Sequence, residues 1–144
     1  MQIEPIYEDV SEFVLYADKL IEKYPDQFGN IDVATIACVA IQNKQRSDKK
    51  SQLWDIKAIK PPISRYCQKQ YIFVFFQHDW DELSEKHRKI IVADCLCSIP
   101  PGGGGSVNPM DYKDHSMMLR TLGVDYMGRD DVPDPLEDIV EWKK

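Results

Sequence analysis

The sequence predicts an α+β fold in a single domain. An amphipathic helical pattern occupies Asp9 to Tyr24, β-rich segments follow between residues 31 and 76, and a second helical pattern runs from Trp80 to Ile99. A chain of 144 residues is long enough for one hydrophobic core but not for two. The apolar fraction of 43% and the charged fraction of 29% are ordinary for a soluble globular domain.

The N-terminal helix has apolar residues at three- and four-residue steps, the spacing of one buried helical face. Asp9 or Ser11 is the expected N-cap, because short polar side chains accept hydrogen bonds from the first amides of a helix. Pro25 and Gly29 end the helix.

Three strands are expected after this helix. Residues 31–41 are rich in β-branched and small residues, which predicts a buried strand, and residues 52–59 predict a second strand that two prolines break. Residues 71–76 (YIFVFF) are apolar on both faces and predict a third strand in the centre of the sheet. We expect these three strands to form a mostly antiparallel sheet.

The pattern from Trp80 to Ile99 is the longest helix-compatible run with an apolar centre. Ser84 is the expected N-cap, and Glu85 places negative charge in the first turn, where the helix dipole favours it. From Ile90 onward nearly every face is apolar or small, which predicts a central helix buried in the core. Two prolines then stop the helix.

A glycine-rich loop follows at Gly102 to Ser106, and the sequence after it predicts a C-terminal helix. Asp111 is the expected cap of this helix, His115 lies on its apolar face, and Gly123 closes it. We therefore expect one domain over residues 1–128 and an acidic C-terminal tail over residues 129–144.

The net charge of −6 is unevenly distributed. Residues 44–69 carry eight lysines and arginines against two aspartates, so this strip has a charge of +6 and the remainder of the chain −12. One interpretation is a solvated edge hairpin, in which lysines discourage aggregation. The other is a surface that binds an acidic partner or a polyanion, for which the candidate contacts are Lys44, Arg46, Lys49 and Lys50.

The four cysteines are expected to be reduced, because Cys38 and Cys95 lie inside hydrophobic segments. No apolar run approaches the roughly 20 residues that span a bilayer, and the acidic N-terminus is unlike a signal peptide. We therefore expect a cytoplasmic protein without a membrane partner.

Several segments, in order, resemble the phage metallopeptidase family of small zincin-like proteins. LIEKYPDQFG is similar to the end of the family's first helix, and YIFVFFQHDWDELSEKHRKIIVADCLCSI resembles its strand, its W-x-x-L sequence and the helix that bears H-E-L-x-H-I. In DYKDHSMMLRTLG, the positions of Asp111, His115 and Gly123 keep the spacing of its later helix. The resemblance covers about Leu20 to Asp125 and implies a zincin-like domain.

The catalytic centre departs from that pattern. Zinc hydrolysis needs two imidazoles at i and i+4 on one helical face and a carboxylate beside the first as general base. Here Asp94 replaces the first ligand, Cys95 the general base and Ser98 the second ligand. The peptidase reaction should be absent, and no cofactor is expected. If zinc were nevertheless bound, its ligands would come from Asp94, Cys95, Asp111 and His115.

Three hypotheses for the function follow. The first is a catalytically inactive metallopeptidase-like domain that acts as a binding or inhibitor protein. It would be phage or prophage encoded, work in the host cytoplasm and bind a host or phage protein or another host macromolecule. The second is a divergent metal-dependent hydrolase that uses Asp94, Cys95 and Asp111. The third is nucleic-acid binding through the basic 44–69 strip, with Trp54, Tyr66 and Tyr71 as stacking residues.

Overall fold

The computed structural model describes residues 4–47, 53–100, 116–123 and 125–143. Among the described helices, none has the length and apolar character needed to cross a membrane.

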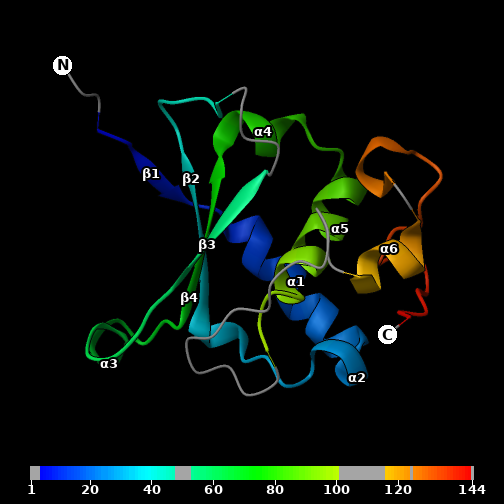
Figure 1. Cartoon of the computed structure of the whole chain (residues 1–144), viewed down its shortest axis with the longest axis horizontal. Helices are drawn as coiled ribbons and strands as arrows, with labels where there is room; N and C mark the ends of the chain where they lie inside the picture. The colour runs from blue at the N-terminus through cyan, green and yellow to red at the C-terminus, as the bar shows by residue number, and fades with distance from the viewer. Residues whose placement is uncertain (1–3, 48–52, 101–115, 124, 144) are drawn as a thin grey trace.

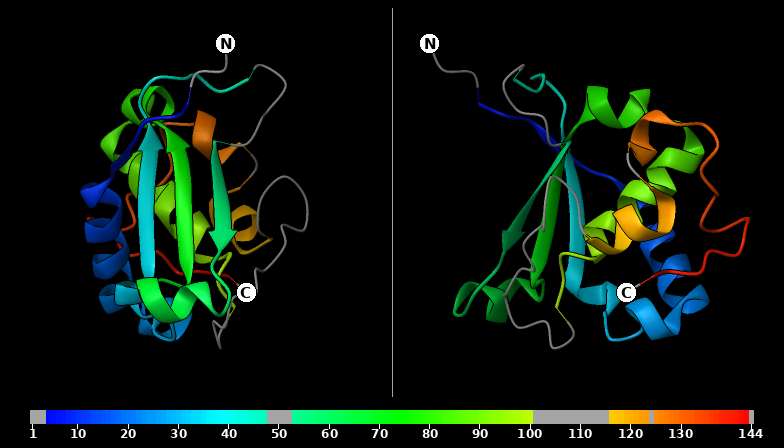
Figure 2. Two further views of the ribbon diagram at one scale, coloured as in Figure 1. Left: turned by 90° about the vertical axis from the view of Figure 1, so that its left-hand side faces the viewer. Right: turned by 45° about the vertical axis from the view of Figure 1, so that its right-hand side comes forward.

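The structure has two layers, a four-stranded mixed sheet and a set of helices that pack on one of its faces (Figure 1). Helices α1 (Ser11–Lys23) and α5 (Glu85–Leu96) lie side by side in the helical layer. No described helix lies across the opposite face, and only α3 (Ile63–Cys67) projects on that side, from one end of the sheet (Figure 2). The class is α+β, as the sequence predicts.

The sheet differs from the expected one in the number and the direction of its strands. It has four strands in the order β1-β2-β4-β3, and β2 pairs with β4 in parallel, whereas the two outer pairings are antiparallel. The extra strand, β1, has three exposed residues without a hydrophobic pattern, so nothing in the sequence signalled it. The strands are β1 (Tyr7–Asp9), β2 (Ile36–Ile41), β3 (Trp54–Ala58) and β4 (Tyr71–Phe76).

Strand β4 lies in the interior of the sheet, as its apolar sequence predicts. It pairs with β2 over its whole length and with β3 on its other side. Strand β3 lies at the edge of the sheet, a position that suits the polar side chains of Asp55 and Lys57. Strand β4 therefore lies next to β2, with β3 on its outer side. The adjacent strands β2 and β4 therefore provide the continuous apolar surface on which the helices pack.

Helix α1 packs its apolar face on this sheet through Phe13, Ala17 and Leu20, which are fully buried. The Phe13 ring lies 5.2 Å from the ring of Phe73, measured between centroids. The expected cap is wrong, because Val10 occupies the N-cap position and no side chain caps the helix. The amide of Val10 instead donates to the carbonyl of Cys38, 2.9 Å away, which joins the start of α1 to the sheet.

The predicted run from Trp80 to Ile99 forms two helices, α4 (Gln77–Glu82) and α5. Ser84 lies between them and caps α5 as expected, since its side chain accepts a hydrogen bond from the His87 amide. Helix α5 ends at Leu96, ahead of the prolines that were expected to stop it. Residues Ile90 to Leu96 are all buried, in agreement with the expected central helix.

The C-terminal segment, residues 129–143, packs on the helical layer. The Tyr24 hydroxyl donates to the Pro135 carbonyl at 2.6 Å and accepts from the Val140 amide at 3.1 Å. The Trp142 ring meets the Tyr24 ring edge to face, with 5.7 Å between centroids, and Val140 and Trp142 are buried. These contacts place apolar residues of the acidic segment inside the hydrophobic core.

The remaining elements are short. Helix α6 ends before Gly123, whose positive φ of 87° closes it as expected. In η1 the Asp32 side chain accepts a hydrogen bond from Ala34, and this turn replaces the first part of the predicted strand 31–41. These elements are α2 (Pro25–Phe28), η1 (Val33–Thr35), α6 (Ser116–Leu122) and η2 (Tyr126–Gly128).

Candidate functional site

The three positions that correspond to the zinc-peptidase motif lie at the C-terminal end of α5. Asp94 and Cys95 are in its last turn, and Ser98 follows the helix. Their exposed fractions are 3% for Asp94, 0% for Cys95 and 2% for Ser98. A hydrolytic centre has to admit water and substrate to the reacting atoms. These three side chains are instead buried.

The backbone around Ser98 also departs from the geometry that the motif requires. The Cys97 amide is shared between the carbonyls of Ala93 and Asp94, both at 3.1 Å, and the amides of Ser98 and Ile99 donate to carbonyls three residues earlier, at 3.0 and 3.1 Å. Such bonds tighten the chain from about 100° to about 120° per residue, the winding of a 3₁₀ turn. Ser98 therefore lies beyond the regular part of α5, whereas two ligands at i and i+4 need one face of a regular α-helix.

The environment of Cys95 opposes its ionisation. Burial raises the pKa of this thiol well above its ordinary value, and the Asp94 carboxylate and the thiols of Cys38 and Cys97 raise it further. Burial likewise raises the pKa values of Cys38 and Cys97. Because the thiolate is the nucleophilic and metal-binding form, these three thiols are poorly prepared for either role.

The described residues at the motif positions are a poor set of ligands for a catalytic zinc ion. The serine hydroxyl is a poor zinc ligand and lies beyond the end of α5, and the thiol of Cys95 favours its neutral form. Among the described residues, no three histidine, cysteine or acidic side chains are grouped as metal ligands would be. Two residues of the expected ligand set, Asp111 and His115, lie outside the described residues.

The structure describes two of the four residues expected to bind a partner. Lys44 is exposed, but the Nε of Arg46 lies 3.0 Å from the carboxylate of Asp79, an ion pair that holds Arg46 against α4. Lys49 and Lys50 lie outside the described residues. The connection that carries them is not a hairpin turn, because β4 lies between β2 and β3.

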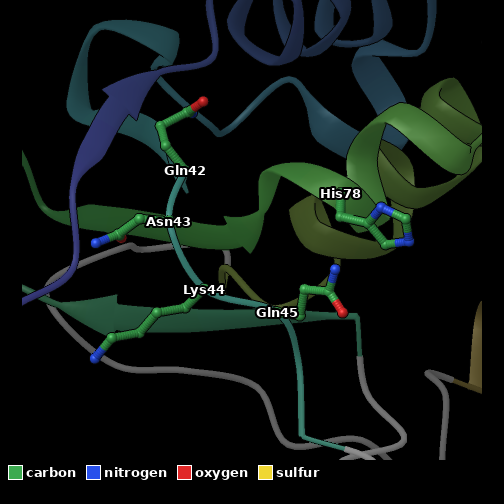
Figure 3. A pocket seen from close by; sticks show the side chains of 5 residues that line it. All are labelled: Gln42, Asn43, Lys44, Gln45 and His78. Carbon is green, nitrogen blue, oxygen red and sulfur yellow. The ribbon is translucent and has the colours of Figure 1, made fainter. Parts of the chain in front are cut away.

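A pocket with a volume of about 300 Å³ lies at the end of β2 that leads into this connection (Figure 3). Its lining is polar and contains one candidate contact, Lys44, beside one histidine from α4. None of the lining residues belongs to α5, so this pocket is not the remnant of a zinc-peptidase cleft. The lining residues are Gln42, Asn43, Lys44, Gln45 and His78.

The three aromatic residues expected to stack on nucleic acid have different environments. Trp54 and Tyr71 are buried, with exposed fractions of 4% and 1%, so neither presents a ring face to a ligand. Tyr66, in contrast, is 83% exposed on α3. Of the three aromatic residues expected to stack on nucleic acid, only Tyr66 is therefore exposed for this role.

Comparison with known proteins gives one match. The model of the family described as "Putative phage metallopeptidase" matches residues 6–141, nearly the whole chain. Neither the curated proteins nor the solved structures include a significant match to the chain.

Proposed function

Because the chain belongs to the putative phage metallopeptidase family, we propose that it is a catalytically inactive member that acts by binding. Its target is a protein or another macromolecule of a bacterial host, and the chain works in the host cytoplasm. In this proposal, the chain retains the fold of the family but does not carry out its reaction.

One observation carries the proposal. The positions of the two ligands and the general base hold Asp94, Ser98 and Cys95, and all three are buried in the core. Loss of one zinc ligand could leave a weakened enzyme, whereas replacement of every group of the motif leaves no part of the reaction to perform. Burial of these three side chains at the end of α5 is consistent with a scaffold that retains its fold for another purpose.

The divergent hydrolase is the second candidate, and the environment of Cys95 argues against it. A nucleophilic or metal-bound thiol needs a lowered pKa, and burial raises the pKa of Cys95 instead. The third candidate is nucleic-acid binding through the 44–69 strip. Two of its three aromatic residues, Trp54 and Tyr71, are buried, and the charge of Arg46 is paired with Asp79, so few of the expected contacts remain.

Elemental analysis tests the proposal directly, on protein purified without chelator or histidine tag. We expect less than roughly 0.1 zinc per chain, since structural and catalytic sites hold zinc tightly enough to survive purification. Peptidase assays on a protein substrate with added zinc should show no turnover. About one zinc per chain, lost in Asp94→Asn or Cys95→Ser, would refute the proposal and favour the divergent hydrolase.

The binding role needs its own test, because absence of activity does not demonstrate a partner. In a phage or cell-based assay of function, Asp94→Asn and Cys95→Ser should leave the effect of the chain intact, provided that the thermal midpoint of each variant is close to that of the wild type. Changes of exposed residues should abolish the effect. The opposite pattern would show that the buried positions still perform chemistry.

A further inference from the structure

The most prominent exposed apolar side chains of the sheet layer are on α3. Tyr66 is 83% exposed and Ile63 is 66% exposed, although large apolar side chains are usually covered in a monomeric protein. They are three residues apart on one helix, so they lie on the same side of it. We call residues 59–70, which carry both side chains, the α3 tip.

The base of the α3 tip is held by three hydrogen bonds. The amide of Ile59 donates to the carbonyl of Gln70 at 2.7 Å, and the amide of Gln70 donates to Thr35 at 2.7 Å. The ammonium of Lys69 donates to the carbonyl of Ala34 at 2.9 Å. The tip is therefore anchored to the β2 side of the sheet as well as to β4, and it presents Ile63 and Tyr66 from a fixed base.

The charge of this region is opposite to that of the whole protein. No acidic residue occurs from Ile56 to His78, and the α3 tip carries three cations on a chain with a net charge of −6. The nearest preceding carboxylate, Asp55, lies 3.6 Å from the ammonium of Lys57. The cations of the tip are Lys60, Arg65 and Lys69.

The sheet face next to the tip is apolar along its two interior strands, β2 and β4. The α3 tip projects on the side of the sheet that has no described helix across it (Figure 2). Val39 lies beside Val74 in the register on that face, and Ile72 is in the following row. These three side chains are half-buried, and charged residues of the outer strands end the same rows: Asp9 lies beside Val39, Asp55 beside Val74 and Lys57 beside Ile72.

We infer that the α3 tip is the docking site for an acidic protein partner, with Ile63 and Tyr66 inserted in an apolar pocket whose rim carries carboxylates. This inference rests on the proposed binding function and assigns its surface. Tyrosine and arginine are the residue types that most often dominate protein interfaces, and Arg65 is adjacent to Tyr66. Opposite charges at the rim would steer the encounter.

A protein fits these observations better than a nucleic acid. The tip projects from the end of the sheet, whereas proteins that bind single strands line a cationic groove with several stacking rings. Only one exposed ring and three cations are available here, and Ile63 has no ring to stack. The rest of the chain, with its excess of negative charge, would repel a long polyanion.

Site-specific photocrosslinking in an extract of the bacterial host tests the inference. A benzoylphenylalanine replaces Tyr66 in one bait and Ile139 in the control bait. Ile139 is 86% exposed and belongs to the C-terminal segment, which lies on the opposite side of the molecule from α3 (Figure 1). The protein that crosslinks only at position 66 is then identified, purified and titrated with the uncrosslinked chain.

We expect Tyr66→Ala and Ile63→Ser to weaken binding of that protein at least about tenfold, as at other interface hot spots. Arg65→Glu should also weaken it, and added salt should reduce the difference between Arg65→Glu and wild type. The matched controls are Ile139→Ala and Lys19→Glu, the second at an exposed lysine of α1. Both should bind as the wild type does, and unchanged thermal midpoints show that every variant is folded.

Four outcomes would overturn the inference: no protein adduct specific to position 66, a second copy of the chain as the only adduct, a partner that is insensitive to the tip variants, or Tyr66-dependent binding only to a defined oligonucleotide or to phosphatidylserine vesicles. A partner that binds elsewhere removes the docking site but leaves the proposed function standing. Zinc-dependent peptidase activity removes the proposed function whatever the tip variants do.

Discussion

The ammonium of Lys89 lies 2.9 Å from the carboxylate of Asp134, and the lysine side chain is only 4% exposed. This ion pair joins the central helix α5 to the C-terminal segment, 45 residues later in the chain. The carboxylates of Glu85 and Glu137 lie at 3.7 and 4.0 Å from the same ammonium. The buried cation is therefore surrounded by acidic side chains from both segments.

Removing the charge of Asp134 should destabilise the protein. Asp134→Asn leaves Lys89 buried with only the two more exposed glutamates beside it, and the expected loss in free energy of unfolding is about 3 kcal/mol. Urea denaturation at neutral pH measures this loss. The double variant Lys89→Met/Asp134→Asn, which has no buried charge here, should recover much of it. A double variant as unstable as Asp134→Asn would show that packing, and not the charge, is responsible.

The same ion pair should make stability depend on pH in acid. Burial opposes the charged form of Asp134, but the hydrogen bonds from Lys89 and from two backbone amides outweigh it and lower the pKa of the carboxyl below its ordinary 3.8. The contribution of this group is therefore present above pH 3.8 and is lost as the pH falls through the lower folded pKa. The difference between wild type and Asp134→Asn should shrink from pH 7 to pH 2.

In alkaline solution, the contribution of the ion pair to stability should be lost as the pH rises, not as it falls. Burial alone would lower the pKa of Lys89, yet the hydrogen bond and charge of Asp134 and the nearby glutamates raise it above its ordinary 10.5. This contribution is complete below pH 10.5 and is lost only as the pH rises through the folded pKa. Wild type and the double variant Lys89→Met/Asp134→Asn, which lacks both groups, should therefore differ by a constant amount between pH 6 and pH 9, and a slope there would contradict this account.

The Tyr24 hydroxyl should hold the C-terminal segment on the helical layer. Tyr24→Phe leaves the Pro135 carbonyl and the Val140 amide without this partner, at an expected cost of about 2 kcal/mol. Limited proteolysis should then cut the segment faster. Tyr7→Phe, on a ring that is 53% exposed, is the control and should change neither stability nor cleavage. Equal cleavage of wild type and Tyr24→Phe would show that apolar packing alone secures the segment.

The Ser84 cap should contribute measurably to α5. Its side chain accepts from the His87 amide at 3.2 Å and lies 2.7 Å from Nδ1 of the same histidine. Ser84→Ala removes both interactions and should cost about 1 kcal/mol or more. Ser84→Thr keeps the hydroxyl and should lose less in the same denaturation experiment. Identical losses in the two variants would mean that the cap is not the source of the effect.

Thiol reactivity should distinguish one cysteine from the other three. Cys67 is exposed, whereas burial raises the pKa values of Cys38, Cys95 and Cys97. Ellman's reagent should therefore titrate a single thiol rapidly in the native protein and all four in denaturant. Cys67→Ser should abolish the rapid phase. A rapid phase that persists in this variant would reveal a reactive core thiol and revive the divergent hydrolase.

Local sequence patterns predicted the elements with strong signals. Apolar runs identified β4 as an interior strand and α5 as a buried helix, and a serine and a glycine marked two helix ends. The short, exposed β1 has no such pattern. The parallel pairing of β2 with β4 was missed as well, because strand direction depends on which strands become neighbours, and local periodicity does not contain that information.

At the candidate site, too, some features follow from the sequence and others depend on the tertiary structure. The sequence by itself determined that the zinc-peptidase motif is absent, because ligand chemistry depends on residue identity at fixed spacing. Only the tertiary structure decided that Cys95 is sealed in the core, that Lys89 meets Asp134, and that Tyr66 stays exposed while Trp54 and Tyr71 are buried. Burial and charge pairing depend on segments far apart in the chain, and those segments meet only in the folded protein.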